Sequence, residues 1–404
     1  MTIVGTEIHA LEARHVLQTY RRQPVTFVRG QGVRLWDADG REYIDLLSGI
    51  GVAALGHGHA GLAQAIAEQA QTLIHTSNLF FHPLQGQLGQ RLAQLSGLPR
   101  AFFCNSGAEA VEACLKFARR YWYTRGEPRR ELVALEDSFH GRTFGALSVT
   151  SDEHYRAPFE PLVPGVRFVP ANDPAALLAA VSTATAAIIA ESIQGEGGVR
   201  PLSSAFGAAI MEASARTGAL VIADEVQSGL GRTGQPFAFP AVGLTPHLIS
   251  VGKALGGGVP IGAALVSEDV AGTIAFGDHG STYGGNLLAC RAGICVTDAL
   301  ISGGLLAHIA EVGRHMEQRL RALAGAHPIV REVRGAGLIW GIELNRDATA
   351  VVPAGLAAGV VVNRTAETVV RLLPPLVITA GDIDEGVARL ETALAAVSSG
   401  SGAA

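Results

Sequence analysis

Lysine is almost absent from this chain of 404 residues: of its 31 Lys and Arg side chains, only Lys116 and Lys253 are lysines. An arginine stays protonated in proteins, whereas a buried lysine amine can lose its proton and act as a base or a nucleophile. Amine chemistry is therefore confined to two positions. Lys116 follows Glu112 by four residues in a charged helical segment, which favours an ordinary solvated side chain.

Three further absences narrow the class of protein. The chain has no long block of Lys and Arg, and its net charge is −5, so nucleic-acid binding is not predicted. Its four cysteines form no C-x-x-C pair and are too sparse for a disulfide scaffold, which predicts free thiols in the cytoplasm. The first residues lack a signal-peptide core. The uncharged stretch 174–190 follows a capping Asp173 and contains Ser and Thr, so no membrane partner is predicted.

Common ligand motifs are missing or stand in the wrong context. Residues 229–234 match G-x-G-x-x-G, but a segment rich in Pro and Phe follows them, where nicotinamide binding requires a helix. Lys253 is followed by Ala, where a P-loop requires Ser or Thr. His57 and His59 form a lone H-x-H without further metal ligands, so we interpret them as loop structure and predict no metal.

What the chain does have, between residues 100 and 290, is an alternation of short apolar runs with longer amphipathic segments. Strands are predicted at 101–104, 132–135, 187–191 and 220–224. A helix is predicted to begin at Ser106. This alternation is typical of an α/β fold with a largely parallel, buried sheet.

The segments on either side follow other patterns, with a hairpin predicted around 33–40, a helix at 303–324 and a strand at 369–374. We therefore expect the two ends of the chain to build a smaller domain together. The predicted organisation is a small-domain segment at 1–65, a large domain at 66–296, the remainder of the small domain at 297–396 and a flexible tail rich in Gly, Ser and Ala at 397–404.

Lys253 stands in a different context from Lys116. It follows an apolar run that includes Leu248 and Ile249, and it precedes three glycines at 256–258, where the backbone can approach a ligand closely. A desolvated amine is the kind that forms Schiff bases with carbonyl compounds.

The segment from Asn105 to Ala110 ends a predicted strand and opens a predicted helix. The N–H groups of Gly107 and Ala108 and the hydroxyl of Ser106 could bind a phosphate at the positive end of that helix. Ser106 and Glu109 also fit an ordinary capping box, S-x-x-E, and the pattern alone does not decide between these interpretations.

Asp224 ends a buried strand, at the edge where α/β sheets bind ligands. By itself it could be a metal ligand, a helix cap or the partner of a ring nitrogen. A lysine for an aldehyde, a helix N-terminus for a phosphate and an aspartate for a pyridinium nitrogen together match one cofactor, pyridoxal 5′-phosphate.

The chain resembles the class III aminotransferases of the fold-type-I pyridoxal-phosphate enzymes. The resemblance covers nearly the whole chain and rests on motifs at 105–110, 139–143, 194–198, 224–227, 253–258 and 279–286. It implies a large domain with a mainly parallel sheet between helices and a smaller α+β domain from both chain ends. It also implies a transaminase that forms a homodimer.

For the cofactor ring, the resemblance implies that Lys253 holds the aldehyde and moves the proton, while Asp224 keeps the ring nitrogen protonated. Phe139 and Val226 would cover the two faces of the ring, and Gln227 would reach its phenolic oxygen. The phosphate would be held by four residues: Ser106, Gly107, Ala108 and Thr282 of the partner subunit.

For the substrates, the resemblance implies transfer of the terminal amino group of N2-acetyl-L-ornithine to 2-oxoglutarate. The products would be N-acetylglutamate 5-semialdehyde and glutamate, in arginine biosynthesis. Arg142, with Ser281 nearby, would bind the carboxylate of acetylornithine, and Arg371 would bind the α-carboxylate of glutamate or 2-oxoglutarate. Glu196 would pair with Arg371 whenever acetylornithine occupies the site.

The motifs leave other amino donors open, namely ornithine, succinyl-diaminopimelate, 4-aminobutyrate and carrier-linked lysine. An aminomutase would share most of the motifs without needing a keto acid. A non-catalytic pyridoxal-phosphate-binding regulator is disfavoured because the lysine, the aspartate and both arginines are present. Ser192 and Leu287 depart from the family, which usually has Pro at both positions.

Overall fold

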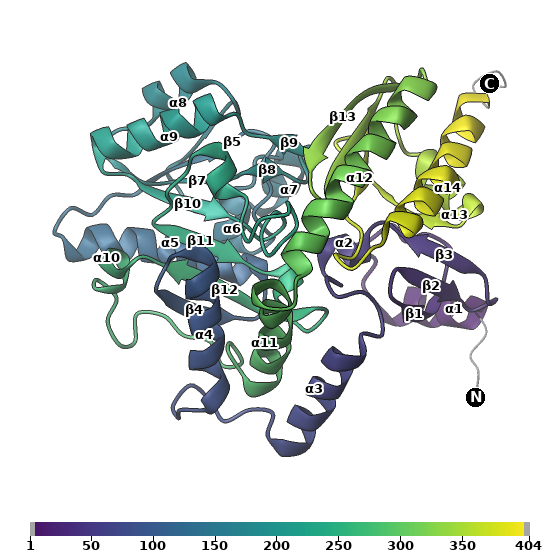
Figure 1. The fold of residues 1–404 in the computed structure, drawn as a ribbon. Coiled ribbons are helices and arrows are strands. Elements are labelled where there is room, and N and C mark those ends of the chain that lie inside the picture. The colour runs from purple at the N-terminus through teal and green to yellow at the C-terminus, as the bar shows by residue number, and fades with distance from the viewer. Residues whose placement is uncertain (1–4, 400–404) are drawn as a thin grey trace.

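A seven-stranded sheet forms the centre of the computed structural model, which describes residues 5–399 (Figure 1). The strand order is β4-β12-β11-β10-β7-β5-β6. The strands are β4 (Arg100–Cys104), β5 (Glu131–Leu135), β6 (Val166–Val169), β7 (Thr185–Glu191), β10 (Leu220–Asp224), β11 (Leu248–Val251) and β12 (Gly262–Val266). Pairing is parallel from β11 to β6, and β12 runs antiparallel to both of its neighbours.

Helices cover both faces of this sheet, which explains why its strands are apolar along their whole length. Ile189 and Ile222 pack into the core under α5 (Gly107–Thr124), whereas Ile188 and Val221 pack under α8 (Pro174–Ala180) and α9 (Ser204–Thr217). Because successive side chains of a strand point to opposite faces, each strand contributes to both cores. The predicted cap is present: Asp173 accepts a hydrogen bond from Ala176 N at the start of α8.

Strands from the two ends of the chain pair with each other. A second sheet has the order β1-β2-β3-β15, and Val360 of β15 pairs in parallel with Ile44 of β3. A third sheet has the order β13-β14-β17-β16, and β8 and β9 form a short ribbon. In Figure 1 the purple N-terminal strands and the yellow C-terminal helix α14 lie on the same side of the molecule.

The bounds of these strands are β1 (Phe27–Gln31), β2 (Arg34–Asp37), β3 (Glu42–Asp45), β8 (Ile193–Gln194), β9 (Arg200–Pro201), β13 (Val330–Ala336), β14 (Ile339–Leu344), β15 (Val360–Val361), β16 (Asn363–Thr365) and β17 (Val369–Leu372). The remaining α-helices are α1 (Gly5–His15), α2 (Ser48–Gly51), α3 (Ala60–Thr72), α4 (Pro83–Ser96), α6 (Phe144–Ser148), α7 (Glu153–Arg156), α10 (Glu268–Ala271), α11 (Leu287–Ile301), α12 (Leu305–Ala326), α13 (Val351–Ala358) and α14 (Ala380–Ser399). Short 3-10 helices are η1 (Ala157–Phe159), η2 (Phe239–Val242) and η3 (Lys253–Gly256).

The predicted α/β class is confirmed, and each strand predicted between residues 100 and 290 is present within a residue or two. The element that follows residues 229–234 is the short 3-10 helix η2, and not the α-helix that nicotinamide binding requires. The domain bounds stay predictions, and their dividing positions fall inside α3 and α11. The first three residues of the predicted tail belong to α14, and its remainder lies outside the described residues.

Among residues 5–399, no single helix is long and apolar enough to span a membrane. Helices α11 and α12 meet the criteria of length and composition only as a pair bent by 68°.

Candidate active site

Three turns meet at one edge of the central sheet, after β4, β10 and β11. A Cβ atom on Gly252 would lie 3.0 Å from the Cα atom of Gly107, and one on Gly107 would lie 2.5 Å from Cγ1 of Val226. Only glycine allows backbones to approach this closely. The predicted Lys253, Asp224 and Ser106 segments are thus brought together at the position where α/β sheets bind ligands.

Lys253 begins η3 with a backbone φ of +40°, a left-handed conformation that is costly for a residue with a side chain. Burial lowers the pKa of its amine below the ordinary value. The negative charges of Glu196 and Asp224 oppose this shift, and Arg371 adds to it. The result is an amine with an increased neutral fraction, which is the form that attacks a carbonyl or accepts a proton.

Asp224 is held by a buried histidine that we did not predict as a site residue. His140 Nδ1 lies 2.6 Å from Asp224 Oδ2, and both side chains are almost fully buried. Burial alone would lower the pKa of His140, but its hydrogen bond to Asp224 and the charges of Asp224 and Glu191 raise it overall. Its Nε2 atom is buried without a hydrogen-bond partner among the described residues. The signal was available, because His140 lies inside the Phe-His-Gly-Arg motif.

Glu191 is a second residue that sequence reasoning missed. It ends β7 directly beside Asp224 in the sheet, and it accepts hydrogen bonds from Phe139 N at 3.0 Å and Gly195 N at 3.2 Å. Burial raises the pKa of its carboxyl group to about 7. The rule that selected Asp224, a carboxylate at the end of a buried strand, applies equally to Glu191.

The N-terminus of α5 is capped by Ser106, as the capping-box interpretation predicted, but Glu109 reaches back to the residue before the cap. Glu109 N donates to Ser106 Oγ at 3.2 Å, and Asn105 N donates to Glu109 Oε2 at 2.6 Å. The cap leaves the N–H groups of Gly107 and Ala108 without an acceptor among the described residues. Two N–H donors at the positive end of a long helix remain available for an anion.

Arg371, on β17, is buried and paired. Its Nη1 atom lies 2.5 Å from Glu196 Oε1 and 3.2 Å from both Gly195 O and Gln227 Oε1, while Nε donates to Asn363. Burial alone would raise the pKa of Glu196, but Arg371 outweighs this effect and lowers it overall. This guanidinium therefore has a built-in carboxylate partner.

Arg142 is exposed and held differently. Its Cζ atom lies 3.5 Å from the centre of the Tyr155 ring and 5.4 Å from that of Phe139. Within residues 5–399 its side chain forms no hydrogen bond and no ion pair. Ser281 Oγ accepts hydrogen bonds from Asn105 Nδ2 and Gly284 N, and its predicted place beside Arg142 stays a prediction.

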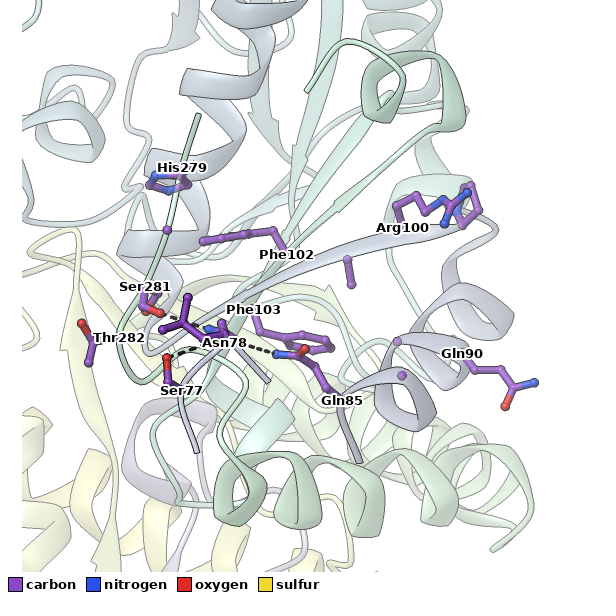
Figure 2. Close-up of a pocket in the computed structure, with 16 residues that line it drawn as sticks. Ser77, Asn78, Gln85, Gln90, Arg100, Phe102, Phe103, His279, Ser281 and Thr282 are labelled. Atoms are coloured by element: carbon purple, nitrogen blue, oxygen red, sulfur yellow. Dashed lines mark hydrogen bonds between the residues drawn. The ribbon is translucent and has the colours of Figure 1, made fainter. Parts of the chain in front are cut away.

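Two cavities of about 1000 Å³ lie beside these residues. One is lined by Phe139, Tyr155, Glu196 and Thr365, among others. Figure 2 shows the other, with Ser281 and Thr282 at one end of the hollow and Gln90 and Arg100 at the other. Thr282 is exposed, and its hydroxyl has no hydrogen bond to any described residue.

Other sequence features have structural roles. His57 Nε2 lies 2.7 Å from Asp45, and the ring of His59 caps α3 by accepting a hydrogen bond. Across the described part of the chain, no group of three or more His, Cys, Asp or Glu side chains is placed to hold a metal ion. All four cysteines are free thiols.

The two departures from Pro have different effects. Ser192 Oγ lies 3.3 Å from Glu225, a buried carboxylate that also accepts from Ser228. Leu287 N donates to Ile74 O at 3.1 Å, a bond that Pro could not form. Neither residue interrupts the three turns of the site.

Residues 17–394 match the class III aminotransferase family. The acetylornithine aminotransferase 1 of Bordetella bronchiseptica is 45% identical over 91% of this chain and 94% of its own length. The chain belongs to the class III aminotransferases. It is therefore a pyridoxal-phosphate-dependent transaminase, which confirms the predicted family, fold type and cofactor.

Solved structures of class III aminotransferases agree with this assignment. A Toxoplasma gondii ornithine aminotransferase with partial occupancy of pyridoxal phosphate at its active site is 31% identical, with a TM-score of 0.94 over 98% of this chain and 96% of that one. An N-acetylornithine aminotransferase from Stenotrophomonas maltophilia is 33% identical, with a TM-score of 0.83 over 96% and 99%.

Proposed function

We propose that this enzyme transfers the terminal amino group of N2-acetyl-L-ornithine to 2-oxoglutarate, giving N-acetylglutamate 5-semialdehyde and glutamate, in arginine biosynthesis. The relative from Bordetella bronchiseptica carries the name of this activity. The observation that carries the proposal is the difference between the two arginines of the predicted site. Arg371 has its own carboxylate partner, and Arg142 has none. One pocket can thereby accept two substrates whose carboxylates lie at different distances from the reacting amine.

The residues present fit the cofactor. The free N–H groups of Gly107 and Ala108 would bind its phosphate together with Ser106. Asp224, held by His140, would face its ring nitrogen. Phe139 and Val226 would cover the two ring faces, and Gln227 would lie near the phenolic oxygen. When bound, pyridoxal phosphate supplies an electron sink for the negative charge that develops on the substrate carbon.

The chain's own residues then have separate tasks. Lys253 would bind the cofactor's aldehyde and, when released, would carry the proton between the substrate carbon and the cofactor. Arg142 would bind the distal carboxylate of acetylornithine, with Ser281 supporting that end. Arg371 would bind the α-carboxylate of glutamate once Glu196 has moved away, because a guanidinium pairs with carboxylate through two parallel hydrogen bonds.

We further propose that the enzyme is a homodimer in which Thr282 of the partner subunit completes the phosphate site. The support is the exposed, unbonded Thr282 hydroxyl at the end of the hollow in Figure 2. Large apolar side chains are also exposed in the segments 79–81 and 276–283, and Leu79 lines the same hollow as Thr282, which is typical of an interface. They are Leu79, Phe80, Phe81, Phe276 and Tyr283. The four free thiols support a reducing compartment such as the cytoplasm.

The decisive experiment measures the first half-reaction by stopped-flow absorbance of the bound cofactor. The donors are N2-acetyl-L-ornithine, L-ornithine, succinyl-diaminopimelate and 4-aminobutyrate, and Lys253→Arg serves as the inactive control. We expect the highest kcat/KM with acetylornithine. Ornithine is the second candidate because of the likeness to the Toxoplasma gondii enzyme. A higher kcat/KM for any other donor would overturn the proposed substrate.

A further inference from the structure

We propose that Tyr155 is a positioning residue that orients Arg142 for the distal carboxylate of the amino donor. The inference rests on the proposed function, since it takes Arg142 as the group that binds this carboxylate. Tyr155 belongs to none of the sequence motifs that predicted the site.

The first observation is the contact itself. A distance of 3.5 Å between Arg142 Cζ and the centre of the Tyr155 ring places the guanidinium directly on the ring face. Phe139 lies farther away, at 5.4 Å, and its ring meets that of Tyr155 edge to face. A guanidinium stacked in this way keeps its N–H donors at its edge, free to form the paired hydrogen bonds that a carboxylate accepts.

The second observation is that the ring is the main described restraint on an exposed arginine. Arg142 forms no ion pair or side-chain hydrogen bond within residues 5–399. An unrestrained arginine loses much rotamer freedom when it binds a ligand, so a ring that holds it in advance improves affinity. The hydroxyl of Tyr155 likewise has no hydrogen bond to a described residue, which assigns the role to the ring face.

The third observation is that Tyr155 is fixed relative to the loop that carries Arg142. Helix α7, which contains Tyr155, is capped by Asp152, whose carboxylate accepts from His154 N. The residues before it are bonded to that loop, because Ser151 N donates to Ser138 O at 3.1 Å. His140 N likewise donates to Thr150 Oγ1 at 2.9 Å. The ring and the arginine therefore lie on two segments that are hydrogen-bonded to each other.

The fourth observation is the location. Tyr155 and Phe139 line a cavity of about 1010 Å³ whose lining also includes Glu196 and Thr365. Glu196 is the ion-pair partner of Arg371. The cavity therefore has in its lining both the ring that contacts Arg142 and the carboxylate that pairs with Arg371, and under the proposed function the amino donor would bind beside it.

The test compares Tyr155→Leu with Tyr155→Phe in the holoenzyme. We expect Tyr155→Leu to raise KM for acetylornithine about three- to tenfold, the range expected for a lost cation–π contact, with kcat and the glutamate half-reaction within about twofold of wild type. Tyr155→Phe, which keeps the aromatic ring, should leave KM for acetylornithine at the wild-type value. The Ki of N2-acetyl-L-norvaline, which has the carboxylate but no terminal amine, should rise in parallel with KM.

A matched control is available away from this cavity. Arg29 Cζ lies 3.6 Å from the centre of the Trp36 ring, so Trp36→Leu makes the same kind of change to a pair outside the site. We expect it to leave KM for acetylornithine unchanged. A thermal unfolding midpoint for each variant separates loss of folding from loss of positioning, and Tyr155→Phe remains informative if Tyr155→Leu is unstable.

A double-mutant cycle with Arg142→Gln separates this inference from the proposed function. If Tyr155 acts through Arg142, then Tyr155→Leu should add nothing to the KM defect of Arg142→Gln. Suppose that Arg142→Gln raises KM strongly, and that Tyr155→Leu either has no effect or adds its own effect to that of Arg142→Gln. The role of Tyr155 would then be wrong, and the assignment of Arg142 would stand. If Arg142→Gln leaves acetylornithine binding intact, both the assignment of Arg142 and the role of Tyr155 are wrong.

Discussion

The two arginines of the site are held in opposite ways. Arg371 is 1% exposed and lies against the carboxylate of Glu196, whereas Arg142 is exposed and lies against the ring of Tyr155. A buried charge without a partner is strongly unfavourable, so Arg371 requires a carboxylate at all times, either from Glu196 or from a substrate. An exposed arginine has no such requirement. Under the proposed function, the Arg371 end would therefore act as a switch between Glu196 and substrate, and the Arg142 end would stay open to the donor.

The largest expected effect comes from Lys253, and it tests whether the Arg142 end and the Arg371 end bind substrates that react at the same amine. Lys253→Arg should reduce both half-reactions by on the order of a thousandfold, because a guanidinium remains protonated and cannot replace the amine as nucleophile or base. Stopped-flow absorbance with acetylornithine and with glutamate measures this loss. Peptide mapping after borohydride reduction of the wild-type enzyme should place the label on Lys253. Label on Lys116 would contradict the assignment of the cofactor site.

The next largest effect should come from Arg371 and should be confined mainly to the glutamate half-reaction. Arg371→Lys replaces a fork of donors by a single ammonium, so we expect the glutamate half-reaction to lose about a hundredfold in kcat/KM. The acetylornithine half-reaction should lose much less, because the ammonium can still pair with Glu196. Measuring both half-reactions in the same preparation controls for folding. Equal losses in the two would show that the ends do not divide the substrates.

The corresponding substitution at the other arginine, Arg142→Lys, should have a smaller effect on kinetics. Arg142→Lys keeps a positive charge at an exposed position but loses the flat stack on Tyr155, so we expect about a tenfold rise in KM for acetylornithine. KM for glutamate should stay within about twofold. A rise in both KM values would mean that Arg142 supports the fold of the site rather than one substrate.

Sequence reasoning found the parts of the site that depend on position along a strand or helix. Lys253, Asp224 and Ser106 each follow or open a regular element, and the ends of neighbouring parallel strands meet at one edge of the sheet. Glu191 obeys the same rule and was missed only because the rule was applied to one strand.

Contacts set by tertiary packing could not be predicted in this way. Glu112, four residues before Lys116 on the same helix, accepts hydrogen bonds from Thr143 Oγ1, Gly145 N and Ala146 N. Lys116 is exposed, as expected, and its Nζ atom lies 2.8 Å from His279 Nδ1. Helical spacing gives the neighbours on one helix and says nothing about a loop that packs across it. The contact between Arg142 and the Tyr155 ring could not be predicted from the sequence for the same reason.

The last effect concerns stability and not turnover. Glu191 accepts hydrogen bonds from Phe139 N and Gly195 N, on the two sides of the site. Burial raises the pKa of this carboxyl group from 4.5 to about 7, so the folded state binds its proton more tightly than the unfolded state does. Its contribution to stability is fully present below pH 4.5 and is lost as the pH rises through 7. Glu191→Gln removes this titration. The fall in the free energy of unfolding between pH 4.5 and 7.5 should shrink by on the order of 2 kcal/mol, measured by urea denaturation.

Glu225 provides the control for this prediction, because burial also raises the pKa of its carboxyl group to about 7 while its bonds go to Ser192, Ser228, Ala238 and Phe239. Glu225→Gln should change the pH dependence of stability by a similar amount. Of the two variants, Glu191→Gln alone should alter the pH dependence of both half-reactions. The reason is that Glu191 accepts hydrogen bonds from Phe139 N, near Arg142, and from Gly195 N, near Arg371. If Glu191→Gln leaves the pH dependence of stability unchanged, then Glu191 does not change its protonation state between pH 4.5 and 7.5. Its carboxyl group would then not couple the Arg142 and Arg371 ends of the site.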